Sequence, residues 1–158
     1  DTYLHFMEKL AVDVMTVVDA SGELLTKVLP LRPFLIKPNR HELEEIFGVT
    51  LTDRLSVIPY AKKMQEMGAG NVLVSMAGQG AVLLAEDGSV YEAPAPEGKL
   101  VNGVGAGDSM VAGFVAGWLE KRDYGHAFRM GLAAGSATAF SEGLASGKEI
   151  RALYKEIR

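Results

Sequence analysis

Residues 103–109 (GVGAGDS) combine closely spaced glycines with one carboxylate, directly before an apolar stretch. Glycines let the backbone approach a ligand closely, and the free amides of a helix N-terminus form an anion site that suits phosphate. A carboxylate repels phosphate, so Asp108 makes chemical sense there if it accepts a proton from a hydroxyl that attacks a phosphoryl group. Aspartate also stabilises the first turn of many helices without any further role. The loop alone leaves both interpretations open.

Two common nucleotide-binding motifs do not fit this loop. A P-loop needs Lys followed by Ser or Thr after its glycines, and no such pair follows here. The dinucleotide-binding fingerprint spaces its glycines as GxGxxG, whereas this sequence reads GxGxGD and lies late in the chain. The loop therefore predicts an anion site of another kind.

Residues 37–42 (KPNRHE) hold a second candidate group, Asn39 and Glu42. Asn39 is a favourable N-cap with Glu42 three residues later, which is the pattern of a capping box. The same two side chains, if they follow a strand of a parallel sheet, would lie at the edge where open α/β sheets bind ligands. There they could orient water molecules on Mg²⁺. Both interpretations remain open at this point.

Composition excludes several classes of protein. The chain has 158 residues and a net charge of −4, and this acidic balance argues against a large nucleic-acid-binding face. It contains no cysteine, which excludes disulfides and thiolate metal sites. No apolar run is long enough to span a membrane, and the first residues do not resemble a signal peptide. His5, His41 and His126 match no metal-ligand spacing and are expected at the surface.

The order of the elements predicts an α/β fold with a mostly parallel sheet, because short apolar strands alternate with amphipathic helices. A hairpin adds an antiparallel part, and the absence of linkers indicates one domain over residues 1–158. The predicted strands are 12–18, 34–36, 71–76, 81–85 and 89–92, and the predicted helices are 3–10, 23–29, 39–47, 52–67, 109–121, 126–140 and 148–157.

Three segments occur in order along the chain: KPNRHE, then SMAGQGA, then NGVGAGDSMVAGF. With their spacing, the sequence resembles the ribokinase-like PfkB family of carbohydrate kinases over essentially its whole length. The subgroup it most resembles is that of the 1-phosphofructokinases, with the tagatose-6-phosphate kinases nearby. The resemblance implies a three-layer α/β/α fold and an ATP- and Mg²⁺-dependent kinase of the cytoplasm whose full-length form is a homodimer.

The resemblance also assigns roles to individual residues. Asp108 would be the catalytic base, and Asn39 and Glu42 would hold the metal through water. The amides of Gly105, Ala106 and Gly107 would form an anion hole. The ATP-binding residues would be Ser75, Met76, Ala77, Gly78, Gln79, Gly80, Gly107, Asp108, Ala133 and Ser136, with Ala134 and Ala137 beside the last two at the adenine.

Three departures from the family pattern matter. Many members have Gly at the position of Ala77 and Thr or Ser at that of Gly103. The family's N-terminal half, with its sugar-binding residues and lid, has no counterpart, so we expect residues 1–158 to be the nucleotide-binding and catalytic-base portion and inactive alone. The implied reaction converts fructose 1-phosphate to fructose 1,6-bisphosphate. The alternatives are a kinase for tagatose 6-phosphate, another sugar or a nucleoside, and a non-catalytic nucleotide-binding module.

Overall fold

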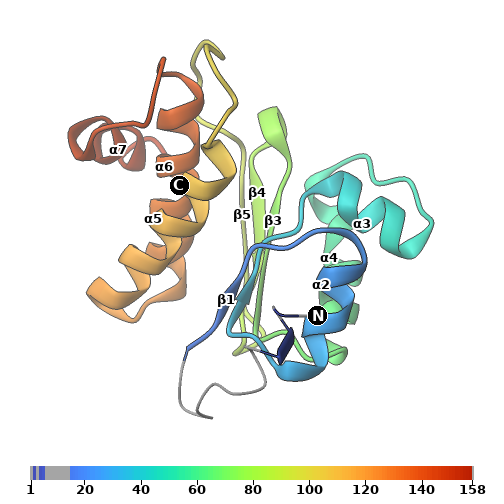
Figure 1. The fold of residues 1–158 in the computed structure, drawn as a ribbon. Helices are drawn as coiled ribbons and strands as arrows, with labels where there is room; N and C mark the ends of the chain where they lie inside the picture. The colour runs from blue at the N-terminus through green and yellow to red at the C-terminus, as the bar shows by residue number, and fades with distance from the viewer. Residues whose placement is uncertain (1, 3, 6–14, 158) are drawn as a thin grey trace. The chain divides into compact units, whose positions relative to one another are not determined.

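The computed structural model describes residues 2, 4–5 and 15–157, so all but residues 4 and 5 of the predicted helix at 3–10 and the start of the predicted strand at 12–18 lie outside the described residues. The chain is an α/β protein (Figure 1), and its strands follow one another in the sheet in the order β1-β2-β3-β4-β5. By their internal contacts the residues form two compact units. Unit 1 comprises residues 1–75 and 82–90, and unit 2 comprises residues 76–81 and 91–158.

Unit 1 is built on parallel strands. Strand β1 (Val17–Val18) pairs with β2 (Leu35–Ile36), which pairs with β3 (Asn71–Ser75), in both cases in parallel. These short, buried strands alternate with helices, as a parallel sheet requires. The helices are α2 (Gly22–Val28), continued by the 3-10 turn η1 (Leu29–Leu31), then α3 (Arg40–Phe47) and α4 (Arg54–Glu66). The largest fully buried side chains of this unit are Leu25, Leu29, Leu35, Ile36, Leu43, Met64, Leu73 and Leu83.

Local sequence signals set the ends of helix α3. Asn39 is its N-cap, with Oδ1 accepting from the Glu42 amide at 2.9 Å and Glu42 Oε1 accepting from the Asn39 amide at 3.2 Å. The predicted capping box is therefore confirmed. Gly48 ends the helix in the left-handed conformation, with φ 63°, which glycine adopts at low cost.

The predicted hairpin corresponds to β4 (Ala81–Leu84) and β5 (Val90–Ala93), two successive strands joined by a tight turn. The Ala85 amide donates to the Ser89 carbonyl at 2.9 Å, and Gly88 has a φ of 88°. Asn71 ties this turn to the sheet, because its side chain donates to the Phe34 carbonyl at 3.0 Å and accepts from the Glu86 amide at 2.7 Å.

Unit 2 contains three helices, α5 (Ala106–Lys121), α6 (Tyr124–Ala139) and α7 (Gly147–Tyr154). Figure 1 shows α5 and α6 side by side, and small residues allow this close approach. A Cβ on Gly113 would lie 2.6 Å from the Met130 carbonyl oxygen, and one on Gly131 would lie 2.9 Å from that of Met110. Larger side chains at either glycine would push the two helices apart.

Two expectations for unit 2 were wrong. Helix α5 begins at Ala106 rather than at residue 109, because Gly105 with φ 82° turns the chain into the helix earlier. His126 is buried, only 6% exposed, because its Nδ1 lies 2.8 Å from the Tyr154 hydroxyl and its Nε2 lies 3.4 Å from a Glu120 carboxylate oxygen. Of the helices among the described residues, none has the length and apolar character that a bilayer crossing demands.

Candidate functional site

The glycine loop of unit 2 leads directly into helix α5. Gly105 is the N-cap residue, so Ala106, Gly107 and Asp108 form the first helical turn. None of the described hydrogen bonds uses the amide of Gly105, Gly107 or Asp108 as donor, whereas the Ala106 amide donates to the Gly103 carbonyl at 3.3 Å. Free amides at the positive end of a 16-residue helix can bind an anion. The Asp108 amide lies on the same turn, whereas the predicted anion hole comprised only Gly105, Ala106 and Gly107.

The Asp108 carboxylate is exposed. It makes none of the hydrogen bonds or ion pairs found among the described residues, and no side chain caps helix α5. A capping aspartate would accept a hydrogen bond from a backbone amide near the helix start. The arrangement therefore fits a carboxylate free to accept a proton better than one that serves only as a helix cap.

The segment that enters the glycine loop is held by the end of helix α6. The Val101 and Asn102 amides both donate to the Ala139 carbonyl, at 2.9 and 3.1 Å. The Asn102 side chain then accepts from the Val104 amide at 3.0 Å. On the helix side of the loop, the Ser109 hydroxyl lies 2.8 Å from the Thr138 hydroxyl.

The predicted phosphate loop runs from Ser75 to Gly80, and its residues 76–80 form a compact turn around the 3-10 element η2 (Ala77–Gln79). The Met76 amide donates to the Gly80 carbonyl at 2.9 Å, which closes the turn. Ala77 and Gly78 are exposed, and their amides donate to no described backbone acceptor. This places two donors where an anion could reach them.

Backbone geometry at this turn shows why many family members have glycine at the position of Ala77. Ala77 has a φ of 48°, in the left-handed region that glycine adopts more readily than alanine. Gly80 has a φ of 92°, and a Cβ there would lie 2.0 Å from the Ala93 carbonyl oxygen. Only glycine fits at position 80, whereas alanine at 77 is accommodated with strain.

The residues predicted to line an adenine pocket lie in helix α6. Ala133 is fully buried, and Ala134, Ser136 and Ala137 are at most 9% exposed. Gly135 packs against the first turns of α5, since a Cβ on it would lie 3.1 Å from the Ala106 carbonyl oxygen. This part of α6 supports the glycine loop, and the adenine assignment stays a prediction.

The other predicted residues lie in unit 1, at the carboxyl edge of the parallel strands. Asn39 forms a parallel bridge with Ser75, and the Ser75 amide donates to the Pro38 carbonyl at 3.1 Å. The two carboxylate oxygens of Glu42 differ: Oε1 caps helix α3, whereas Oε2 is buried without a hydrogen-bond partner among the described residues. A buried oxygen of this kind normally has a partner, such as a water molecule or an ion.

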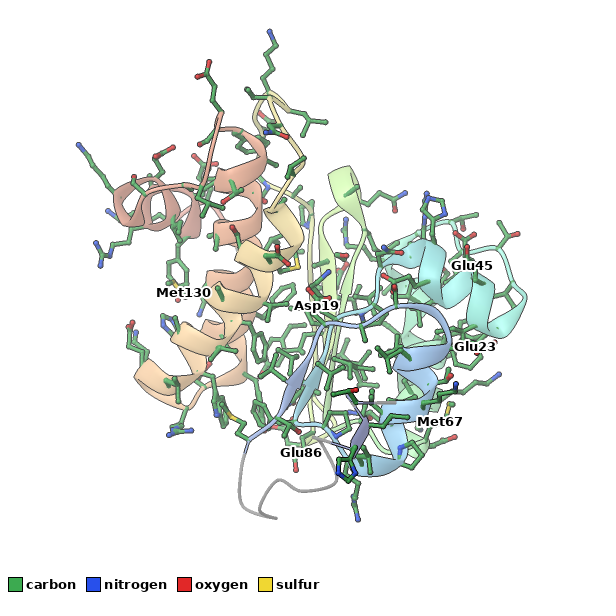
Figure 2. All side chains as sticks on the ribbon, in the orientation of Figure 1. Asp19, Glu23, Glu45, Met67, Glu86 and Met130 are labelled. Carbon is green, nitrogen blue, oxygen red and sulfur yellow. The ribbon has the colours of Figure 1, made fainter. Side chains whose placement is uncertain are left out.

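Lys37 is a buried cation at the same edge of the sheet, and it was not predicted from the sequence. Lys37 follows β2 and is only 8% exposed. Its Nζ lies 3.8 Å from Oδ1 of Asp19, which follows β1 and is labelled in Figure 2. Lysine is rarely this buried unless it is paired. The signal was a lysine directly after an apolar strand, where a charge is unusual.

No group of three or more His, Asp or Glu side chains among the described residues could hold a metal ion by itself. Mg²⁺ usually keeps several water molecules and takes one or two carboxylates together with substrate phosphates. The free Glu42 Oε2 and the neighbouring Asn39 amide group fit that kind of binding.

Comparison with known proteins identifies the class. Residues 5–151 match the family model described as "pfkB family carbohydrate kinase", and the chain belongs to this family. It is 48% identical to the 1-phosphofructokinase of Bacillus subtilis (strain 168) over 159 residues, which cover 100% of this chain and 52% of that protein. The chain thus spans about half the length of that curated relative.

Solved structures show the ribokinase-like fold. The phosphofructokinase-2 of Escherichia coli, solved in complex with substrates and products, superimposes with a TM-score of 0.82 at 32% identity over 90% of this chain and 47% of that one. The ribokinase of Arabidopsis thaliana, solved with ribose and ATP, gives a TM-score of 0.77 at 22% identity over 90% of this chain and 48% of that one. The predicted α/β class, the mostly parallel sheet and the family are confirmed.

Proposed function

We propose that the full-length enzyme containing this chain transfers the γ-phosphoryl group of ATP to a hydroxyl of a ketohexose phosphate, with fructose 1-phosphate as the first candidate. The observation that carries this proposal is the free carboxylate of Asp108 on the same helical turn as the free amides of Gly107 and Asp108. A carboxylate that can act as a base and amides that can bind an anion, both on one turn, suit the attack of a hydroxyl on phosphorus. The 48% identity to a 1-phosphofructokinase supports the substrate class.

In the proposed reaction, the Asp108 carboxylate accepts the proton of the attacking hydroxyl. That oxygen forms a bond to the γ-phosphorus as the bond between this phosphorus and the bridging oxygen breaks, and ADP leaves. The amides of Gly105, Ala106 and Gly107 would donate to the oxygens of the transferring group. For Ala106 this requires its long hydrogen bond to Gly103, at 3.3 Å, to be given up or shared. Positioning and charge stabilisation supply most of the acceleration in such a transfer.

The remaining predicted residues are assigned to the nucleotide and the metal. The turn from Ser75 to Gly80 would bind the ATP phosphates, and Ala133 and Ser136 would lie on the adenine side. Asn39 and Glu42 would hold Mg²⁺ through water, and when bound, the ion would offset the negative charge of the phosphates. These assignments rest on the family pattern and on the donors and the free oxygen described above.

The substitution Asp108→Asn in the full-length enzyme tests the proposal. Asparagine keeps the shape of the side chain but cannot accept the proton, so kcat should fall by about 10²-fold or more. The affinity for ATP should stay the same or increase, because a negative charge beside the phosphates is removed. Turnover within about threefold of wild type would refute the role of Asp108. The assay is product formation by coupled detection of ADP, with nucleotide affinity from calorimetry.

Two further measurements separate the alternatives. Turnover with a panel of fructose 1-phosphate, tagatose 6-phosphate, the unphosphorylated sugars and a nucleoside distinguishes the sugar-phosphate kinase from its relatives. If the full-length enzyme binds ATP but phosphorylates none of them, it is a non-catalytic nucleotide-binding module. Because the chain spans about half of its relative, we also propose that residues 1–158 alone show no kinase activity.

A further inference from the structure

The C-terminal end of helix α6 makes several hydrogen bonds to segments outside the helix. The Ala139 carbonyl accepts from the chain entering the glycine loop. Thr138 contacts the first turn of α5, and its Oγ1 also accepts from the Ala145 amide at 3.2 Å, in the loop between α6 and α7. All of these segments lie in unit 2. Thr138 therefore joins the start of α5 to the loop between α6 and α7, and the neighbouring Ala139 holds the chain that enters the glycine loop.

The contacts of Thr138 use every part of its side chain. Its hydroxyl lies 2.8 Å from the Ser109 hydroxyl, on the residue that follows Asp108. Its methyl group faces the N-cap, since a Cβ on Gly105 would lie 4.0 Å from Thr138 Cγ2. The side chain is 2% exposed, so no bulk water competes for these bonds. A buried hydroxyl with two partners holds a more defined position than an exposed one.

Ser141, only three residues further on, provides a contrast. Its hydroxyl has two acceptors within hydrogen-bond distance, the Ala137 carbonyl at 2.8 Å, four residues back, and Glu149 of helix α7 at 3.0 Å. It thus belongs to the same helix end and makes a similar number of bonds. None of these bonds reaches the glycine loop or α5.

We propose that Thr138 is a positioning residue for the proposed phosphoryl transfer: through its hydrogen bond to Ser109 it fixes the turn that carries the Asp108 carboxylate and the Gly107 amide. This inference rests on the proposed function, because it supposes that this turn does the chemistry. Asp108 itself has no hydrogen bond among the described residues that could fix its position. The turn beneath it must therefore supply the order that proton transfer requires.

Thr138→Val is the main test, because valine keeps the size and the methyl group but loses the hydroxyl. In the full-length enzyme, kcat should fall by about tenfold or more, since small misplacements of reacting groups are costly. The KM values for ATP and sugar phosphate should stay within about twofold, because the variant removes no group assigned to binding them. Thr138→Ser keeps the hydroxyl and should restore kcat to within about threefold of wild type.

A double-mutant cycle identifies the route. If Thr138 acts through Ser109, then Ser109→Ala lowers kcat as well, and the double variant is no worse than Thr138→Val alone. Should Thr138→Val fail to fold, as judged by circular dichroism, Ser109→Ala and Thr138→Ser carry the test. Independent losses that multiply in the double variant would overturn the proposed route.

Ser141→Ala is the matched control, and it should leave kcat within about twofold of wild type. An equal loss of kcat in Ser141→Ala and Thr138→Val would show a general loosening of the helix end and would overturn the inference. The inference would also be overturned if Thr138→Val and Ser109→Ala both turned over normally while Asp108→Asn abolished activity.

Normal turnover in Asp108→Asn would instead refute the proposed function. The inference would then be judged on the 158-residue chain from the backbone amide NMR signals of Gly107 and Asp108. These should shift in Thr138→Val and not in Ser141→Ala, and unchanged signals in Thr138→Val would overturn the placement of the turn by Thr138.

Discussion

The two carboxylate oxygens of Glu42 lead to separate, measurable effects. Oε1 accepts from the Asn39 amide and completes the capping box, whereas Oε2 is buried and lacks a partner among the described residues. In Glu42→Gln the side-chain amide keeps one oxygen, which can still accept a hydrogen bond from the Asn39 backbone amide. The capping box can therefore persist. The variant loses only the negative charge near the helix N-terminus, which is worth about 0.3–1 kcal/mol of unfolding free energy.

For a chain of this size, that loss lowers Tm by at most about 4 °C. Glu42→Ala also removes the cap contact, and its total loss should be about 1–2 kcal/mol. If Oε2 serves the metal, Glu42→Gln has a second effect that capping does not explain. The Mg²⁺ concentration for half-maximal turnover of the full-length enzyme should rise by about 10-fold or more, as is typical when an outer-shell ligand is removed.

The chain offers a matched control in its last helix. Ser146 and Glu149 form a second capping box, but both Glu149 oxygens have partners, Ser146 for Oε1 and Ser141 for Oε2. Glu149→Gln should therefore cost a similar amount of stability and leave the Mg²⁺ dependence unchanged. Melting temperatures come from calorimetry on the 158-residue chain. If the two Gln variants show the same Mg²⁺ dependence as wild type, Glu42 is only a cap and the assignment of Oε2 to the metal is wrong.

Three further predictions concern stability. Hydrogen bonds from the Ser146 amide, then from the Ser146 and Ser141 side chains, lower the pKa of Glu149. The ionised carboxylate therefore stabilises the folded chain above the ordinary pKa of glutamate. This stabilisation is lost as the pH falls through the lowered pKa. The difference in Tm between wild type and Glu149→Gln should thus shrink as the pH falls below the ordinary glutamate pKa and disappear below the lowered value. Ala77→Gly should raise the unfolding free energy by about 0.5–1 kcal/mol in urea denaturation, because it relieves a left-handed alanine. Gly80→Ala should lower it by about 3 kcal/mol or more, and a smaller loss would show that the turn adapts.

The sequence by itself determined the features that depend on neighbouring residues. The capping box of Asn39 and Glu42 and the end of α3 at Gly48 follow from side chains at most a few positions apart, and the structure confirms them. The alternation of strands and helices gave the α/β class for the same reason, since periodicity is a local property. The three ordered motifs identified the family, and the roles of their residues remain predictions.

Only the tertiary structure decided which distant groups meet. Thr138 and Ser109 are 29 positions apart, and no local pattern pairs their hydroxyls. His126 looked like a surface residue, and it is buried because its ring is held by Tyr154, 28 positions away. Lys37 and Asp19 lie at the ends of paired strands, and their approach depends on the register of Val18 with Ile36. Such contacts depend on how elements pack, which the spacing of residues along the chain does not encode.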